Sequence, residues 1–191
     1  MIILITGTPG TGKTSFSRKL SEITGFKHIE LNKEIKENML YEEYDKEKDT
    51  LIMDKKKTAE FLNDYVKKYS GVKKKIYSYF KEIQEKQEIM LKENPVNEKN
   101  FYPIEKILND LQGINIKEKG LIIDSHLSHL FFPEKIDFCI VIKTKLKELE
   151  KRLKKRNYTE EKIRENIDSE IFNVCFNEAV ENGLKVVVLG N

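Results

Sequence analysis

The chain has 191 residues, which is enough for one compact domain with a sizeable core. Hydrophobic residues make up 39% of it and charged residues 35%, a balance that excludes an intrinsically disordered chain. The formal net charge is only +3, and acidic and basic residues are interleaved, so charge alone argues against a nucleic-acid clamp.

The first predicted element is the apolar run 2–6, which is too short for a signal-peptide core or a membrane span. Glycines follow it at once, so it is expected to be a buried strand of a cytoplasmic protein with no membrane partner. Cys139 and Cys175 lack disulfide-framework or metal-ligand spacing, and both are expected to be buried thiols.

A phosphate-binding motif follows this strand directly, because residues 7–14 satisfy the pattern G-x-x-x-x-G-K-[ST]. Gly10 and Gly12 let the backbone curl so that its N–H groups point inward, and the positive end of the following helix adds to the same anion site. Lys13 can then reach the β and γ phosphates of a nucleotide, and the Thr14 hydroxyl is placed to bind Mg²⁺.

Short apolar runs recur along the chain, and they are expected to form strands of a sheet that is covered on both faces. The runs are 2–6, 28–31, 120–124, 138–142 and 184–189. Helical patterns lie between them, and the first covers 15–23. This alternation predicts a doubly wound α/β fold, in which helices flank a five-stranded parallel sheet.

Two excursions interrupt the alternation. The gap between the second and third runs is far longer than a βαβ crossover needs, and it mixes charged helical stretches over 32–65 with a helical run over 72–92. After the fourth run, Asn157 is expected to end one helix and Thr159 to cap the next. The apolar stripe is expected to continue through Ile163, Ile167, Ile171 and Val174.

The third run ends in Asp124, and a carboxylate at that place is the expected direct or outer-shell Mg²⁺ partner in a P-loop protein. An aspartate that only caps the next turn is the alternative. If the chain stays extended past Asp124, the period of two returns His126 to the same face, close to the metal and the γ phosphate. His129 has no such argument and is expected to be a surface or core residue.

Arginine is rare in this lysine-rich chain, which contains only Arg18, Arg152, Arg156 and Arg164. Three of the four lie in the second excursion, and a guanidinium fork matches phosphate oxygens in a way that lysine cannot. Arg152 and Arg156 share a helix face, and Arg156, at the helix break, is the favoured lid residue. Ion pairs with nearby glutamates are the alternative for Arg152 and Arg164.

Four separated motifs resemble, in chain order, those of one known family. They are the P-loop through Ser15; residues 40–45 with Asp49 and Asp54; Asp124-Ser125-His126 followed by Phe-Phe-Pro-Glu at 131–134; and Arg156-Asn157-Tyr158 with 166–167 and 170–172. The family resembled is the adenylate-kinase-like NTPases of archaea and eukaryotes, typified by adenylate kinase isoenzyme 6, which act in maturation of the small ribosomal subunit. Ordinary adenylate kinases are expected to carry D-G-[FY]-P-R where this chain has Asp-Ser-His.

The resemblance implies roles for the matching residues. Lys13 and Arg156 would hold the transferring phosphoryl group, Thr14 and Asp124 would serve Mg²⁺, and His126 would position an attacking water or couple hydrolysis to a partner. The remaining nucleotide-binding positions would be Gly10, Gly12 and Ser15. The implied cofactor is Mg²⁺ with ATP, and the implied partners are ATP, AMP or another monophosphate, a small-subunit platform ribosomal protein and the pre-ribosomal small subunit.

A single P-loop kinase-like domain over 1–191 is therefore expected, with a monophosphate-binding segment over 30–53, a helical insert over 69–119 and a lid over 152–168. Where the family tends to place an arginine in the monophosphate site, this chain has Lys36. The insert has no counterpart in the family pattern, and it is expected to be either a partner-binding arm or a surface decoration.

Two functions remain in competition. The first is an adenylate kinase that converts ATP and AMP into two ADP, with intrinsic ATPase activity and a role in 16S-type rRNA maturation. The second is an assembly factor whose ATPase activity acts as a switch and which has little kinase activity. A small-molecule kinase of another class fits the P-loop but leaves the D-x-H and F-F-P-E motifs unexplained.

Overall fold

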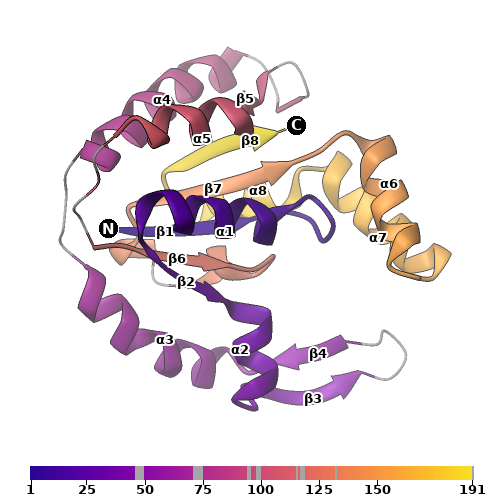
Figure 1. Ribbon diagram of the computed structural model, residues 1–191. Coiled ribbons are helices and arrows are strands. Elements are labelled where there is room, and N and C mark those ends of the chain that lie inside the picture. Colours follow the sequence, from indigo (N-terminus) through magenta and orange to yellow (C-terminus); the bar gives the residue numbers. More distant parts are fainter. Residues whose placement is uncertain are drawn as a thin grey trace.

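The computed structural model describes residues 1–45, 50–70, 75–93, 96–97, 100–114, 116, 119–131 and 133–190. Its centre is a parallel sheet in the order β2-β6-β1-β7-β8-β5 (Figure 1). The strands are β2 (Lys27–Glu30), β6 (Leu121–Asp124), β1 (Ile2–Thr6), β7 (Phe138–Lys143), β8 (Val186–Gly190) and β5 (Tyr102–Pro103). The predicted α/β class and the five expected strands are confirmed.

The sheet has six strands, not the five that the sequence pattern predicts. The sixth, β5, pairs in parallel with the end of β8 through Leu189 and Gly190. It consists of only two residues, Tyr102 and Pro103, and so it lacks the apolar run by which the other strands are recognised.

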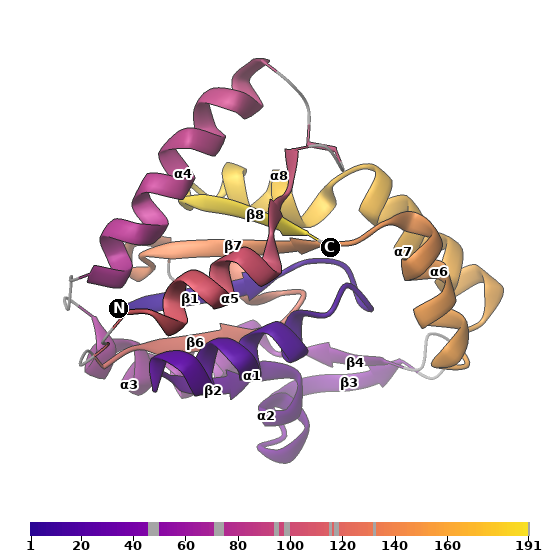
Figure 2. The ribbon, with the colours of Figure 1, turned by 45° about the horizontal axis from the view of Figure 1, so that its top comes forward.

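Helices cover both faces of the sheet. The apolar side chains of β1 accordingly alternate between two core clusters, one on each face. Ile3 and Ile5 face a cluster built with α1 (Lys13–Thr24), α4 (Lys75–Glu93) and α5 (Ile104–Gln112). Ile2 and Leu4 face the opposite cluster, built with α2 (Leu31–Glu37), α3 (Lys55–Tyr69) and α8 (Val174–Glu181). Figure 2, turned from the first view, shows α5 in front of the sheet and α3 behind it.

The segment 69–119 is an integral layer of this fold. Its buried side chains belong to the same cluster as Ile3 and Ile5, and they are Ile76, Phe80, Ile83, Ile104, Ile107, Leu108 and Leu111. Gln87 on α4 is also buried; its side-chain amide donates to the carbonyl of Val188 at 2.7 Å and accepts from the N–H of Val188 at 2.9 Å. The packing of β8 therefore depends on this segment.

Two excursions lie at the carboxyl ends of the parallel strands (Figures 1 and 2). One is the antiparallel hairpin of β3 (Tyr41–Asp45) and β4 (Thr50–Met53), which the sequence did not predict. The other is the helix pair α6 (Leu146–Lys155) and α7 (Glu160–Ile171), whose small core is Leu149, Leu153 and Ile163. Short 3-10 turns, η2 (Ser128–Leu130) and η3 (Pro133–Lys135), follow β6.

The helix boundaries predicted around the second excursion are largely confirmed. Asn157, with φ of 55°, follows α6, and the Thr159 side chain accepts the N–H of Lys162 at the start of α7. The apolar stripe, however, does not run on to Val174 as predicted: α7 ends at Ile171, which is 49% exposed, and Val174 begins the next helix, α8. No helix among the described residues is long and apolar enough to span a membrane.

Candidate active site

The candidate site lies at the carboxyl end of β1, between β6 and β7. In the sheet, β6 and β2 lie on one side of β1, and β7 and β8 lie on the other. The carboxyl ends of β6, β1 and β7 therefore flank a topological switch point. Buried polar side chains end each of the three strands there: Thr6 on β1, Asp124 on β6 and Lys143 on β7. Ligands of open α/β sheets bind at such positions.

The P-loop connects β1 to α1 and holds the predicted lysine against its own backbone. Lys13 Nζ donates to the carbonyl of Gly7 at 2.7 Å and to that of Thr8 at 2.9 Å. Burial is the main reason why the pKa of Lys13 is lowered to about 8; the nearby Asp124 opposes this shift, and the charge of Arg156 adds to it. Lys13 is therefore a buried cation at the start of a helix, where an anionic ligand would favour its charge.

Asp124 contacts a predicted partner and one that the sequence reasoning missed. The Thr14 hydroxyl donates to Asp124 Oδ1 at 3.1 Å, so the two predicted metal-binding groups are adjacent. His28 Nε2 lies 2.5 Å from the other carboxylate oxygen, Oδ2. In the parallel pairing of β2 with β6, His28 lies beside Ile122, two residues before Asp124 on the same face of the sheet.

The oxygen atoms of Thr14 and Asp124 fit a magnesium ion, which prefers hard oxygen ligands and usually takes only one or two from the protein. Among the described residues no group of three or more His, Cys, Asp or Glu side chains could hold a metal ion by itself. A site at Thr14 and Asp124 therefore suits an ion that also binds nucleotide phosphates and water.

His126 does not follow Asp124 on an extended strand, which was the basis for its predicted place. The extended strand ends at Asp124 and the chain turns at His126, so the period-of-two argument is wrong. The half-buried imidazole is nevertheless close to the P-loop, since burial and then the charge of Lys13 lower the pKa of His126 to about 4. At neutral pH this side chain is an uncharged imidazole.

His129 is a core residue with a defined set of partners. Its Nδ1 lies 2.8 Å from the Thr6 hydroxyl, and its Nε2 lies 2.7 Å from Glu178 Oε2 on α8. Thr6 also donates to the backbone carbonyl of His126 at 3.3 Å. The chain between Asp124 and η2 is therefore fixed by buried polar contacts from β1 and α8.

The α6 helix packs directly on the P-loop. Arg152 NH1 lies 3.3 Å from the carbonyls of both Gly10 and Thr11, and its Nε donates to Glu148 at 2.9 Å. The intrahelical ion pair, which was the alternative for Arg152, is thus present, while its contact with a phosphate stays a prediction. Arg156 is exposed at the end of α6, yet its charge acts on Lys13.

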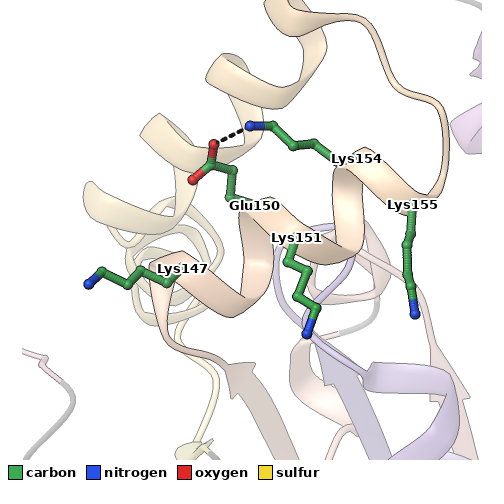
Figure 3. A pocket seen from close by; sticks show the side chains of 5 residues that line it. All are labelled: Lys147, Glu150, Lys151, Lys154 and Lys155. Atoms are coloured by element: carbon green, nitrogen blue, oxygen red, sulfur yellow. Dashed lines mark hydrogen bonds and ion pairs between the residues drawn. The ribbon is translucent and has the colours of Figure 1, made fainter.

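The outer side of α6 carries a basic surface hollow lined by Lys147, Glu150, Lys151, Lys154 and Lys155 (Figure 3). Lys154 turns to Glu150 at 2.7 Å, while Lys151 and Lys155 extend from another side of the helix. Residues 145–156 carry seven basic and two acidic side chains, a net charge of +5, although the whole chain carries only +3. The local charge beside the P-loop is therefore far more positive than the composition indicates.

A second group that the sequence reasoning left without a role lies under the P-loop. Glu170 at the end of α7 is 4% exposed, and its carboxylate contacts the Thr8 hydroxyl, Lys143 Nζ and the Thr144 N–H. The sequence offered a weak signal, because Lys143 ends an otherwise apolar run, and a charge in such a place needs a partner.

The residues predicted to bind the monophosphate acceptor have fewer contacts with the rest of the site than the P-loop residues have. Lys36 is exposed, and Asp54 caps α3 by accepting the Lys57 N–H at 3.0 Å. Ser125 donates to Asn32 Oδ1 at 2.8 Å, which links the D-x-H segment to α2. Of the predicted motif residues, Asp49 and Phe132 lie outside the described part of the chain, and Arg164 and Ser15 are exposed.

The chain is similar to known proteins over nearly its whole length. A family described as an AAA domain matches residues 3–173. The putative adenylate kinase of Methanosarcina mazei is 35% identical over 181 residues, which cover 95% of this chain and 74% of that protein. The adenylate kinase isoenzyme 6 homolog of Caenorhabditis elegans is 26% identical over 180 residues, which cover 94% of this chain and 72% of that protein.

Among solved structures, the deoxyadenosine kinase from M. mycoides with bound dATP covers 99% of this chain and 90% of its own, at 15% identity and a TM-score of 0.40. The family match spans the P-loop, the D-x-H segment and α6–α7. Because that match covers most of the sequence and a relative is 35% identical across it, the chain belongs to the adenylate-kinase-like AAA-domain family.

Proposed function

We propose that this protein is an adenylate-kinase-like enzyme that transfers the γ-phosphoryl group of ATP to AMP, and to related nucleoside monophosphates, to give two diphosphates. The observation that carries the proposal is the contact between Thr14 and Asp124 at the end of a P-loop followed by a helix. Two hard oxygen ligands beside a phosphate cradle suit Mg-ATP. The names of the relatives support the choice of AMP as acceptor.

In this proposal Thr14 and Asp124 hold Mg²⁺ together with the phosphates of ATP. When bound, the ion neutralises the charge that develops on the phosphate oxygens. His28 holds the second oxygen of Asp124 and so keeps the first directed at Thr14. The remaining chemistry is positioning and electrostatic stabilisation, which phosphoryl transfer requires above all.

Lys13 would exchange the carbonyls of Gly7 and Thr8 for the β and γ phosphates of ATP. The anionic ligand would oppose the effect of burial on the pKa of Lys13, because an opposite charge nearby favours the ammonium form. Arg156 acts from the end of α6 on the same phosphoryl group, within a lid proposed to cover 152–168. Closure of that lid would exclude water, which favours transfer to AMP over hydrolysis.

We assign the acceptor to the segment 30–53, which follows β2 and lies at the carboxyl end of the sheet with the hairpin β3–β4 (Figure 1). The contact between Ser125 and Asn32 supports this assignment, because it joins the segment to the strand end that carries Asp124. Lys36 supplies a positive charge in this segment, and its exposure leaves it accessible to an anionic ligand.

A second function, ATP hydrolysis, is favoured by one specific observation. His126 is uncharged at neutral pH and lies near Lys13, so it can accept a hydrogen bond from a water molecule beside the γ phosphate. A protonated histidine could not accept that bond. We therefore propose an intrinsic ATPase activity that depends on His126 and acts as a switch when no acceptor is bound.

The resemblance to adenylate kinase isoenzyme 6 leads us to propose a role in maturation of the small ribosomal subunit, with a platform ribosomal protein as partner. Relatives that carry this name align over most of the chain. The proposal predicts that the purified protein cosediments with immature small subunits and not with large subunits. Equal sedimentation with both particles, or with neither, would remove this part of the proposal.

One assay separates the kinase from the ATPase. The purified protein is incubated with Mg-ATP, with and without AMP, and ADP and inorganic phosphate are quantified together. A kinase forms two ADP per ATP when AMP is present and releases no phosphate. An ATPase releases phosphate whether or not AMP is present.

The His126→Ala variant identifies the group responsible for hydrolysis, and Lys13→Met measures the background of both reactions. We expect the His126→Ala variant to lose phosphate release and to retain transfer to AMP. Hydrolysis that is unchanged in the His126→Ala variant would exclude this histidine from the ATPase reaction. Wild-type protein that forms no more ADP with AMP than without it would contradict the kinase function.

A further inference from the structure

We propose that Glu170 is a positioning residue that joins the P-loop to both ends of the α6–α7 excursion, so that the base of this excursion holds the phosphate-binding loop in place. The inference deepens the proposed function, because it assigns a second residue to the binding of ATP. It concerns ATP affinity and not turnover, so it can be tested whether or not AMP proves to be the acceptor.

Glu170 contacts three different elements through one buried carboxylate. Its Oε2 accepts the Thr8 hydroxyl of the P-loop at 2.6 Å and lies 3.1 Å from Lys143 Nζ at the end of β7. Its Oε1 accepts the N–H of Thr144 at 3.2 Å, and its backbone carbonyl accepts Lys143 Nζ at 2.9 Å. Both oxygens are therefore used, and they join the P-loop to the end of β7 and the residue that follows it.

The positions of these partners in the chain show which segments the contact joins. Lys143 and Thr144 precede α6, and Glu170 lies in the last turn of α7, so the two ends of the α6–α7 excursion meet at this carboxylate. Thr8 is the second residue of the P-loop motif. The α6–α7 pair that leaves the sheet in Figure 1 is thus attached to the P-loop at its base.

A second contact joins α6 to the P-loop at Gly10 and Thr11. Arg152 on α6 contacts the carbonyls of Gly10 and Thr11, and Leu149 packs so closely on Gly10 that an added Cβ atom would lie 2.9 Å from its Cδ1. The P-loop is therefore held from the base of the excursion by Glu170 and from its first helix by Arg152. Movement of α6 cannot leave the loop unchanged.

The path from Glu170 to the nucleotide passes through Thr8 and Lys13. The Thr8 carbonyl accepts Lys13 Nζ at 2.9 Å and the Thr11 hydroxyl at 2.9 Å, while the Thr8 hydroxyl donates to Glu170. Loss of the hydroxyl contact frees Thr8 to rotate, and the carbonyl that orients Lys13 moves with it. Glu170 therefore acts on the phosphate-binding lysine without touching the phosphate.

An ion pair that serves only stability is the competing interpretation of Glu170. Lys143 and Glu170 are each 4% exposed, and such a pair is weak evidence for stability, because desolvation can cancel its attraction. The two interpretations differ in the role that they give to the Thr8 hydroxyl. A purely stabilising pair needs only Lys143, whereas the positioning role needs the P-loop hydroxyl as well.

The test measures the dissociation constant of a fluorescent, non-hydrolysable ATP analogue with Mg²⁺, together with the thermal unfolding midpoint. Thr8→Val removes the hydroxyl and leaves the buried ion pair intact, Glu170→Gln removes the charge, and the double variant closes a thermodynamic cycle. We expect each single variant to bind the analogue about tenfold more weakly, because a hydrogen bond to a charged group is lost. The double variant should bind no more weakly than either single variant.

Gln87→Leu is the matched control, because it also removes a buried side chain with two hydrogen bonds, on the side of the sheet that bears α4. It should lower the unfolding midpoint and leave the affinity unchanged. The proposal is overturned if Glu170→Gln binds the analogue as tightly as wild type, or if the two single effects add in the double variant. If Glu170→Gln does not fold, the Thr8→Val variant alone decides: affinity equal to wild type overturns the proposal.

Discussion

Replacement of the P-loop lysine should abolish ATP binding and at the same time stabilise the nucleotide-free protein. Burial holds the pKa of Lys13 at about 8 in the folded chain, against 10.5 for an exposed lysine. A shift of this size corresponds to about 3 kcal/mol, at ~1.4 kcal/mol per pH unit. In the Lys13→Met variant the buried charge is absent, so we expect a higher free energy of unfolding than wild type at pH 7.

The pH dependence has a defined sign. Between pH 8 and pH 10.5 the unfolded chain keeps the Lys13 proton while the folded chain has released it, so wild type gains stability as the pH rises. Methionine does not titrate. The stability advantage of the Lys13→Met variant should therefore shrink by about 3 kcal/mol across this window.

Urea unfolding of both proteins at pH 7, 8, 9 and 10 measures this difference directly. Because the buried thiol of Cys175 interacts with Lys13, both proteins are best compared in a Cys175→Ala background. A difference between the two proteins that stays constant with pH would refute the reasoning, since it would mean that the lysine is not held in a charged, desolvated state.

Three further outcomes follow from single contacts. Gly10→Ala should lower the unfolding midpoint and the ATP affinity together, because the backbone there has φ of 95° and an added Cβ would lie 2.9 Å from Leu149. A variant with wild-type ATP affinity would contradict the close packing of α6 on the P-loop. Gln87→Leu should cost about 2 kcal/mol in urea unfolding, because it leaves the buried N–H and carbonyl of Val188 without this partner. Burial raises the pKa of Cys139, so an aromatic disulfide reagent at pH 8 should label this thiol only after unfolding, as mass spectrometry of native and denatured samples would establish.

The sheet and the phosphate-binding loop could be predicted from the sequence because both are local signals. The run 2–6 and the motif over 7–14 each specify their structure within a few residues, and the structure contains both. The two-residue strand β5 carries no such pattern, and it exists only because β8 offers a neighbouring backbone. The hairpin β3–β4 was hidden by charged residues, which are depleted in most strands.

The candidate site shows a similar division. Thr14 was predicted from the P-loop motif and Asp124 from its place at the end of a strand, and the two are in contact. His28 and Glu170 could not be derived in the same way, since their partners lie 96 and 162 residues away in the chain. His126 was predicted to lie beside the metal and the γ phosphate on an extended strand, but the strand ends at Asp124 and the chain turns at His126.

The hydrogen bonds between Gln87 and Val188 also bear on how the molecule avoids self-association. A strand at the border of a sheet exposes N–H and carbonyl groups to which another chain can add as a further strand. On the outer side of β8, the glutamine amide occupies the backbone of Val188, and β5 occupies Leu189 and Gly190. One side chain and two residues thus close this border to a foreign strand, and loss of Gln87 would favour aggregation as well as unfolding.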